Sequence, residues 1–169
     1  VRDYWAATPS SPRAPVREIL PTKVDWSDYD SPVRSQGSCG SCSAFAAAAL
    51  IENLMNQAGL PVLADVSEQT FLACGPLSCA GGWYWDALEY AAQFGVPPEA
   101  CYPYEEVTGY CYLRCDDPAY LVRLGQFTPS PGLWAEDHTY NDLRVALQEG
   151  PLVVSMRVPN DGTFAGSNY

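Results

Sequence analysis

Cys42 and Gln36 are the residues of this sequence best suited to covalent chemistry. They lie in the run Gln-Gly-Ser-Cys-Gly-Ser-Cys-Ser-Ala-Phe, residues 36–45. Cys42 opens an Ala-rich stretch that favours a helix, and the free N–H groups and dipole of a helix N-terminus favour thiolate over thiol. A thiolate is the attacking group in covalent catalysis. The Gln36 amide and the Cys42 N–H could converge on one oxygen, as an oxyanion hole requires.

The chain has seven cysteines but only one histidine, His138, and this composition limits the metal sites that the cysteines could form. A zinc site would need to be almost entirely thiolate, and no second Cys-x-x-Cys pair supports one. We therefore expect no metal and no cofactor. Six cysteines in disulfides and one free thiol, in an oxidising compartment, is the better interpretation.

The chain of 169 residues has a formal net charge of −11, and 47% of its residues are hydrophobic. This apolar content excludes general disorder. The acidic balance argues against nucleic acid or an anionic membrane surface as a partner, because both select basic surfaces. No stretch is apolar for the ~20 residues that a membrane span needs.

Several elements must position the candidate site. The apolar residues between 42 and 56 surround the predicted helix on all sides, as in a buried helix that stops at Gly59. Shorter helices are expected from Ser67 and over 140–149, and another over 84–94 that is stopped by Gly95. Residues 120–122 and 152–158 are rich in apolar and β-branched side chains and predict strands.

Besides the Cys39-Gly40-Ser41-Cys42 run, the chain contains two further motifs before it and four after it. Together, and in this order, they resemble the motifs of the papain-like cysteine peptidases, which include the cathepsins. They are Leu-Pro at 20–21, Val-Asp-Trp at 24–26, Val-Ser-Glu-Gln at 66–69, Cys-Ala-Gly-Gly at 79–82, Tyr-Pro-Tyr at 102–104 and Gly-Pro-Leu at 150–152.

This resemblance implies an α+β fold of two lobes, a helical lobe and an antiparallel β-barrel lobe. The helical lobe with the nucleophile would span 20–118. Residues 119–169 would form the first part of the barrel, which is incomplete in this chain. Residues 1–19 are rich in proline and would be an extended arm or a propeptide remnant.

The resemblance also implies roles for individual residues. Cys42 would be the nucleophile and Gln36 the oxyanion-hole donor. Five residues would bind substrate: Gly81 and Gly82 through their backbone, Trp83 and Tyr84 along the non-prime side, and Ser155 as a wall of the specificity pocket. The ordinary alternatives are core aromatic residues at 83 and 84 and a structural strand residue at 155.

The family's disulfides would pair Cys39 with Cys79 and Cys74 with Cys111. The sequence around Cys101 is most similar to cathepsin C, which implies a third pair, Cys101 with Cys115. Cys42 would then be the free thiol.

Two departures from the family pattern stand out. Ser43 follows the nucleophile, where the family usually has Trp. No residue matches the family's catalytic His, which lies ~130–150 residues after the cysteine. His138 lies among acidic residues ahead of a helix and is expected in a solvated loop. We therefore expect either a fragment or one chain of a processed enzyme, with the catalytic His on a second chain.

The resulting hypothesis is a cysteine-type peptidase that hydrolyses peptide bonds through an acyl-enzyme, with endopeptidase action expected. One alternative is a dipeptidyl-type exopeptidase. The other is a non-catalytic pseudo-peptidase that binds peptides or partners. A propeptide or protein inhibitor in the cleft is a further expected partner. The expected compartment is secreted, lysosomal, vacuolar or another oxidising extracytoplasmic one.

Overall fold

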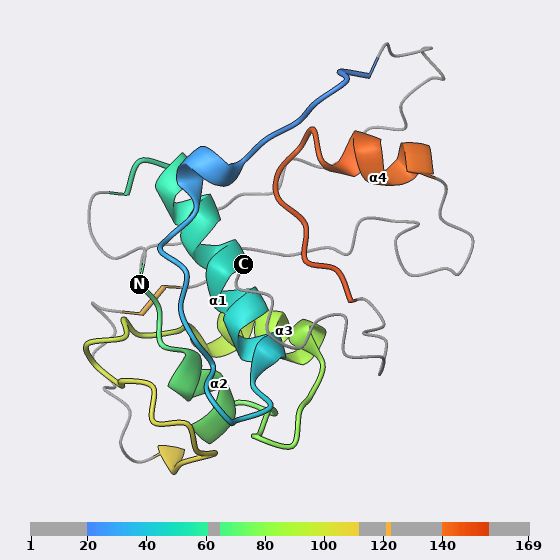
Figure 1. Ribbon diagram of the computed structural model, residues 1–169. Coiled ribbons are helices and arrows are strands. Elements are labelled where there is room, and N and C mark those ends of the chain that lie inside the picture. The colour runs from blue at the N-terminus through green and yellow to red at the C-terminus, as the bar shows by residue number, and fades with distance from the viewer. Residues whose placement is uncertain (1–19, 61–64, 112–120, 123–139, 156–169) are drawn as a thin grey trace.

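The computed structural model describes residues 20–60, 65–111, 121–122 and 140–155, and these contain one 3-10 helix and four α-helices (Figure 1). In chain order they are η1 (Ser27–Tyr29), α1 (Cys42–Gln57), α2 (Glu68–Ala73), α3 (Tyr84–Phe94) and α4 (Tyr140–Ala146).

Helix α1 is the central element, because it contacts η1, α2 and α3. Four consecutive alanines favour the helix intrinsically. It ends in a Schellman motif, in which the N–H groups of Gly59 and Leu60 donate to the carbonyls of Asn56 and Met55 at 3.0 and 3.2 Å. Gly59 has φ of 65°, which a glycine adopts without a steric penalty. The predicted stop at this glycine is confirmed.

Helices α2 and α3 begin and end on local signals. The Ser67 side chain caps α2 by accepting a hydrogen bond from the Thr70 N–H at 3.1 Å. Helix α3 ends at Gly95, where φ is 78°. Val96, which follows, forms an isolated antiparallel bridge with Val122, with N–H···O distances of 2.8 and 2.9 Å. Both helices lie where the sequence predicts them.

The core lies between α1, α2 and α3. Its residues on α1 are spaced three or four apart, so they share one face, and they pack against apolar residues of the other two helices. They are Ala44, Ala47, Ala48, Ile51 and Met55 on α1, Phe71 and Leu72 on α2, and Ala87, Leu88 and Ala91 on α3.

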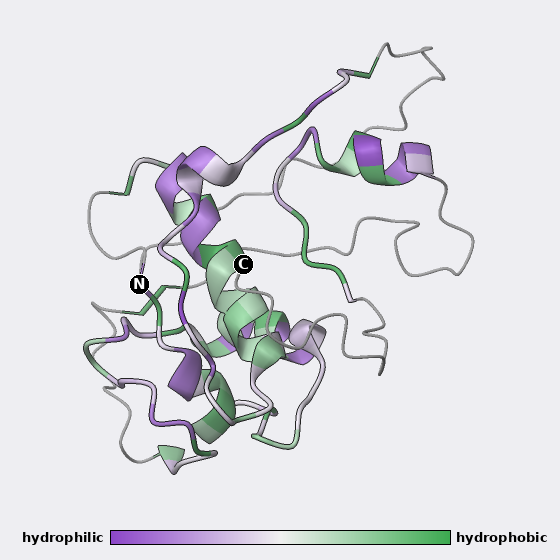
Figure 2. Cartoon of the chain, in the orientation of Figure 1, coloured by the Kyte–Doolittle hydropathy of each residue, from purple (hydrophilic) through white to green (hydrophobic). Residues whose placement is uncertain are grey.

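The expectation that α1 is buried around its whole circumference is wrong. Ala49 is exposed, and Figure 2 shows an apolar first half of the helix followed by a polar second half. Glu52 and Asn53 in that second half are nevertheless buried. The Asn53 amide donates to Trp26 O and Asp30 Oδ1 at 3.0 and 2.6 Å, so this end of the helix is held by polar contacts with η1 and its flanks.

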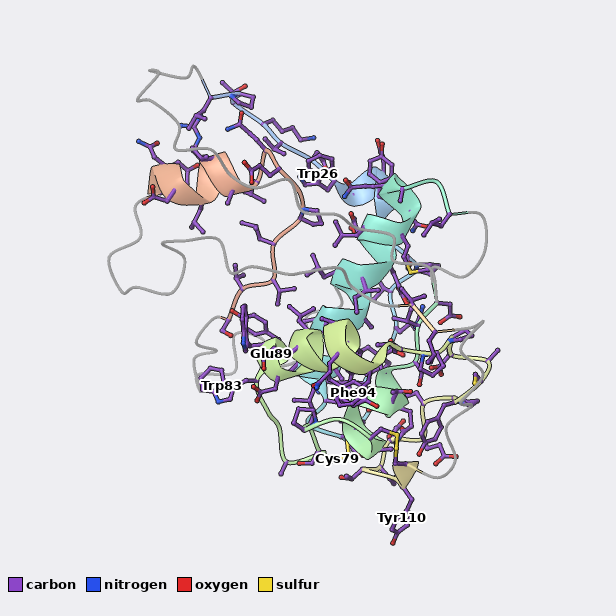
Figure 3. The ribbon with its side chains drawn as sticks, turned by 180° about the vertical axis from the view of Figure 1, so that it is seen from behind. Trp26, Cys79, Trp83, Glu89, Phe94 and Tyr110 are labelled. Atoms are coloured by element: carbon purple, nitrogen blue, oxygen red, sulfur yellow. A yellow bond between two sulfur atoms is a disulfide. The ribbon has the colours of Figure 1, made fainter. Side chains whose placement is uncertain are left out.

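Helix α4 lies apart from α1, α2 and α3 in both Figures 1 and 3. It is joined to the N-terminal segment, because Trp26 Nε1 donates to Leu147 O at 2.8 Å and Arg144 Nη2 donates to Pro21 O at 3.0 Å. It ends at Ala146, and turns occupy the remaining residues of the predicted helix to position 149. In the described part of the chain, no helix is long and apolar enough to cross a membrane.

The predicted strand at 152–158 is not seen over its described part, 152–155. A strand exists only as part of a hydrogen-bonded ladder, and no described segment pairs with these residues. The predicted arm at 1–19, the lobe boundary at 118–119 and His138 lie outside the described residues.

Two of the disulfides implied by the resemblance are confirmed, Cys39–Cys79 and Cys74–Cys111. Cys101 is also disulfide-bonded, and its expected partner, Cys115, lies outside the described residues. These bonds fit an oxidising extracytoplasmic compartment.

Candidate active site

Cys42 is the first residue of α1, and its thiol is free and exposed. The segment that leads to it is fixed on both sides. Cys39 is bonded to Cys79, and the Gly40 N–H donates to the Cys79 carbonyl at 3.0 Å. Ser41, immediately before the thiol, is buried. A free thiol is therefore presented to solvent from a covalently braced turn.

Tyr104 holds the Gln36 segment against the start of α1. Its hydroxyl donates to the Gln36 carbonyl at 2.7 Å and lies 2.7 Å from Ser41 Oγ. Because the single tyrosine proton is used at Gln36, the Ser41 hydroxyl is the donor to Tyr104. The Tyr104 ring also packs edge-on against Phe45, with centroids 4.9 Å apart.

The Gln36 side chain lies on the same turn. Its Nε2 donates to the Cys39 carbonyl at 2.9 Å, which uses one of its two amide protons. The second amide proton can still be donated to an oxyanion. The structure therefore brings Gln36 and Cys42 to one short segment, as the sequence predicts, and adds Tyr104 as the residue that joins its ends. The Tyr-Pro-Tyr motif singles out Tyr104 in the sequence, but it does not indicate that the residue joins these two segments.

The Gly81–Gly82 loop lies opposite the start of α1. Ser78 and Gly81 form an antiparallel bridge in this loop. The Gly81 N–H donates to the Ser78 carbonyl at 2.9 Å, and the Ser78 N–H donates to the Gly81 carbonyl at 3.2 Å. Ser43 Oγ donates to the Gly82 carbonyl at 2.6 Å, which joins this loop to the residue next to the thiol. The two glycines predicted to bind substrate thus lie beside the first turn of α1.

The remaining predicted site residues differ in their surroundings. Trp83 is 70% exposed and projects from the N-terminal end of α3 (Figure 3), whereas Tyr84 is partly buried against the core. Ser155 is exposed. The segment 151–155 runs toward the Trp83 end of α3 in Figures 1 and 3, but among the described residues no hydrogen bond connects Ser155 with the loops around Cys42.

Three acidic residues surround Arg34, and two of them, Glu52 and Glu68, are buried whereas Asp65 is exposed. Arg34 Nη1 is 3.0 Å from Glu68 Oε1, and its Nη2 is 3.0 Å from Glu52 Oε1 and 2.8 Å from Asp65 Oδ1. Glu52 also accepts from the Val66 N–H at 2.8 Å. Sequence reasoning missed this cluster, because its members lie far apart along the chain; Arg34 and Glu68, for example, are separated by 34 residues.

Two carboxyl groups in this region each have one buried oxygen without a hydrogen-bond partner among the described residues. Glu68 Oε2 and Glu99 Oε2 are buried and have no hydrogen-bond partner within the described part of the chain. Burial raises the pKa of Glu68 to about 7, and it also raises the pKa of Glu99. Both side chains therefore hold their protons at pH values where exposed carboxyl groups have lost them.

This cluster predicts that the protein is more stable in mildly acidic than in alkaline solution. In the folded state Glu68 stays protonated up to about pH 7, whereas an unfolded glutamate loses its proton near pH ~4.3. The folded state therefore binds more protons across this interval. Its unfolding free energy should fall by on the order of 2 to 3 kcal/mol as pH rises through it.

Urea unfolding under non-reducing conditions, from about pH 4.5 to about pH 8, measures this dependence. Replacing Glu68 by glutamine, which is neutral at every pH, should flatten the profile. A wild-type profile that is flat or rises with pH would contradict the assignment.

No group of three or more His, Cys, Asp or Glu side chains is placed to hold a metal ion in the described ranges.

Residues 20–165 match the family described as papain family cysteine protease. Over 103 residues the chain is 42% identical to papain from Carica papaya, a match that covers 59% of this chain and 30% of that protein. It is 30% identical to zingipain-1 from Zingiber officinale over 162 residues, covering 89% of this chain and 70% of that protein. The chain therefore belongs to the papain family of cysteine proteases.

Solved structures agree on the fold. Digestive procathepsin L 3 from the larval midgut of Tenebrio molitor matches with a TM-score of 0.63 and 30% identity, over 82% of this chain and 45% of that one. The fold is thus the two-lobe α+β fold of the family, of which the described residues show mainly the helical part. The chain covers less than half of the length of papain and of the procathepsin.

Proposed function

We propose that this protein is a cysteine-type peptidase that hydrolyses peptide bonds through an acyl-enzyme. The observation that carries the proposal is a free, exposed thiol at the first residue of α1, in a member of the papain family. The thiolate of Cys42 attacks the peptide carbonyl, forming a C–S bond and a negatively charged oxygen. The leaving amine departs with a proton, and water then releases the acid.

Gln36 and the Cys42 N–H stabilise the charged oxygen in this proposal. The second amide proton of Gln36 supports its role, because the first already fixes the side chain on Cys39 O. Gly81 and Gly82 offer backbone groups to an extended substrate, and exposed Trp83 lines one side of it. Tyr84 and Ser155 complete the proposed substrate-binding residues.

The proposal also needs an imidazole, which supplies the proton to the leaving amine. We place it on a part of the protein that lies outside the 169 residues, on a second chain of a processed enzyme. The lobe division proposed for the chain is 20–118 and 119–169, with 1–19 as an extended arm or a propeptide remnant. Secretion or a lysosomal or vacuolar location agrees with the disulfides.

The rate of Cys42 alkylation as a function of pH tests the function. Native, unreduced protein is treated with iodoacetamide, and the intact mass gives the fraction labelled. We expect rapid labelling already at about pH 5, far below the ~8.5 at which a free thiol ionises. Such reactivity is typical of a thiolate paired with an imidazolium. Labelling only above about pH 8 would contradict an active peptidase and favour either an incomplete fragment or a pseudo-peptidase that binds peptides without cleaving them.

Endopeptidase action is the finer part of the proposal, and a dipeptidyl-type exopeptidase is the alternative. The bonded state of Cys101 agrees with the cysteine pattern that favours the alternative. Peptides with a blocked N-terminus separate the two, because an endopeptidase cleaves them internally and a dipeptidyl peptidase requires the free amine.

A further inference from the structure

Ser43, the second residue of α1, is bonded to a loop far away in the sequence. Its hydroxyl donates to the Gly82 carbonyl at 2.6 Å, across 39 residues of chain. Serine hydroxyls in helices commonly bond to the backbone of their own helix. Here the hydroxyl instead joins the first turn of α1 to the loop that precedes α3.

This bond acts on a part of the loop that the other connections do not reach. The Cys39–Cys79 disulfide and the bond from Gly40 N–H to Cys79 O both end at residue 79. Beyond it come Gly81, whose N–H and carbonyl are both bonded to Ser78, and Gly82, which has φ of 154° and whose backbone glycine leaves free to rotate. The Ser43 bond holds the peptide group that follows Gly82.

We propose that Ser43 is a positioning residue for peptide binding, which holds the Gly82 carbonyl ready to accept a backbone N–H of an extended substrate. The inference rests on the proposed function. A carbonyl oxygen has two lone pairs, so it accepts from Ser43 and from a peptide at the same time. A loop held in its binding conformation loses less conformational freedom when the peptide binds.

The test compares two reagents that attack the same thiol. Iodoacetamide carries no peptide, whereas a peptidyl chloromethyl ketone must lie along the loop before it reacts with Cys42. In Ser43→Ala we expect the peptidyl rate constant to fall about 3- to 10-fold, the range of one hydrogen bond, with the iodoacetamide rate unchanged. For hydrolysis, KM should rise by the same factor while kcat changes little.

Three controls sharpen the test. Ser43→Thr keeps the hydroxyl and should restore the peptidyl rate. Ser27→Ala removes a bond of the same length, 2.6 Å to Asp25 Oδ1, at the opposite end of α1 and should leave both rates unchanged. Peptidyl reagents methylated at one backbone nitrogen at a time should include one for which wild type and Ser43→Ala react equally, because its N–H is the one that Gly82 accepts.

The proposal is overturned if the peptidyl rate is unchanged or rises in Ser43→Ala, since a rise would mean that Ser43 competes with the peptide. It is also overturned if both reagents slow equally, since the thiol itself would then be altered. Failure of wild-type Cys42 to react at about pH 5 overturns the proposed function instead, and this inference with it. The two failures are therefore distinguishable.

Discussion

The proposed hydrolysis of peptide bonds is expected to fall at least about 10³-fold when Cys42 is replaced by alanine. The variant keeps the braced turn, Gln36 and the loop at Gly81 and Gly82, but it has no atom that can form the acyl-enzyme. Initial rates on an internally cleaved peptide, measured with the native protein and the variant at equal concentration, give the ratio.

The stability of the Cys42→Ala variant serves as its control. The thiol is exposed, so its removal leaves no cavity and the urea midpoint should not move. Ser38→Ala, an exposed serine before the same turn, should keep full activity. Substantial hydrolysis by Cys42→Ala would show that another group is the nucleophile.

Arg34→Met is expected to reduce the unfolding free energy by about 3–5 kcal/mol near neutral pH. The substitution keeps a long apolar stem but leaves buried Glu52 and Glu68 without the cation that neutralises them. Urea unfolding under non-reducing conditions measures the loss. The loss should be smaller at about pH 5, because Glu68 is then neutral in either protein.

Two variants serve as controls for this prediction. Lys23→Met removes a cation whose partner, Asp25, is exposed, and it should leave the urea midpoint unchanged. Combining Arg34→Met with Glu68→Gln should recover part of the lost stability, because one buried charge is removed. Equal losses for Arg34→Met and Lys23→Met would mean that burial of the cluster has no energetic effect.

The helices that carry the site could be predicted because their signals are local. Gly59 and Gly95 end α1 and α3, Ser67 caps α2, and the bounds of α3 agree with the prediction. The strand at 152–158 is a different case, because a strand depends on a partner elsewhere in the chain. Its described part shows no such partner.

The contacts that arrange the site could not be predicted from local patterns. Tyr104 meets Gln36 across 68 residues, and Ser43 meets Gly82 across 39. No periodicity specifies which side chains meet at such separations. The disulfide pairs came from family resemblance, since six cysteines allow ~15 pairings that spacing alone cannot separate.

The two crosslinks Cys39–Cys79 and Cys74–Cys111 overlap along the chain, because Cys74 lies inside the loop that the first one closes. A single backbone cut anywhere between Cys39 and Cys111 therefore leaves the two pieces covalently joined. The cut adds a pair of ends but releases no fragment. For a protein that is itself proposed to be a protease, one nick between these cysteines would not by itself separate the thiol from the loop that faces it.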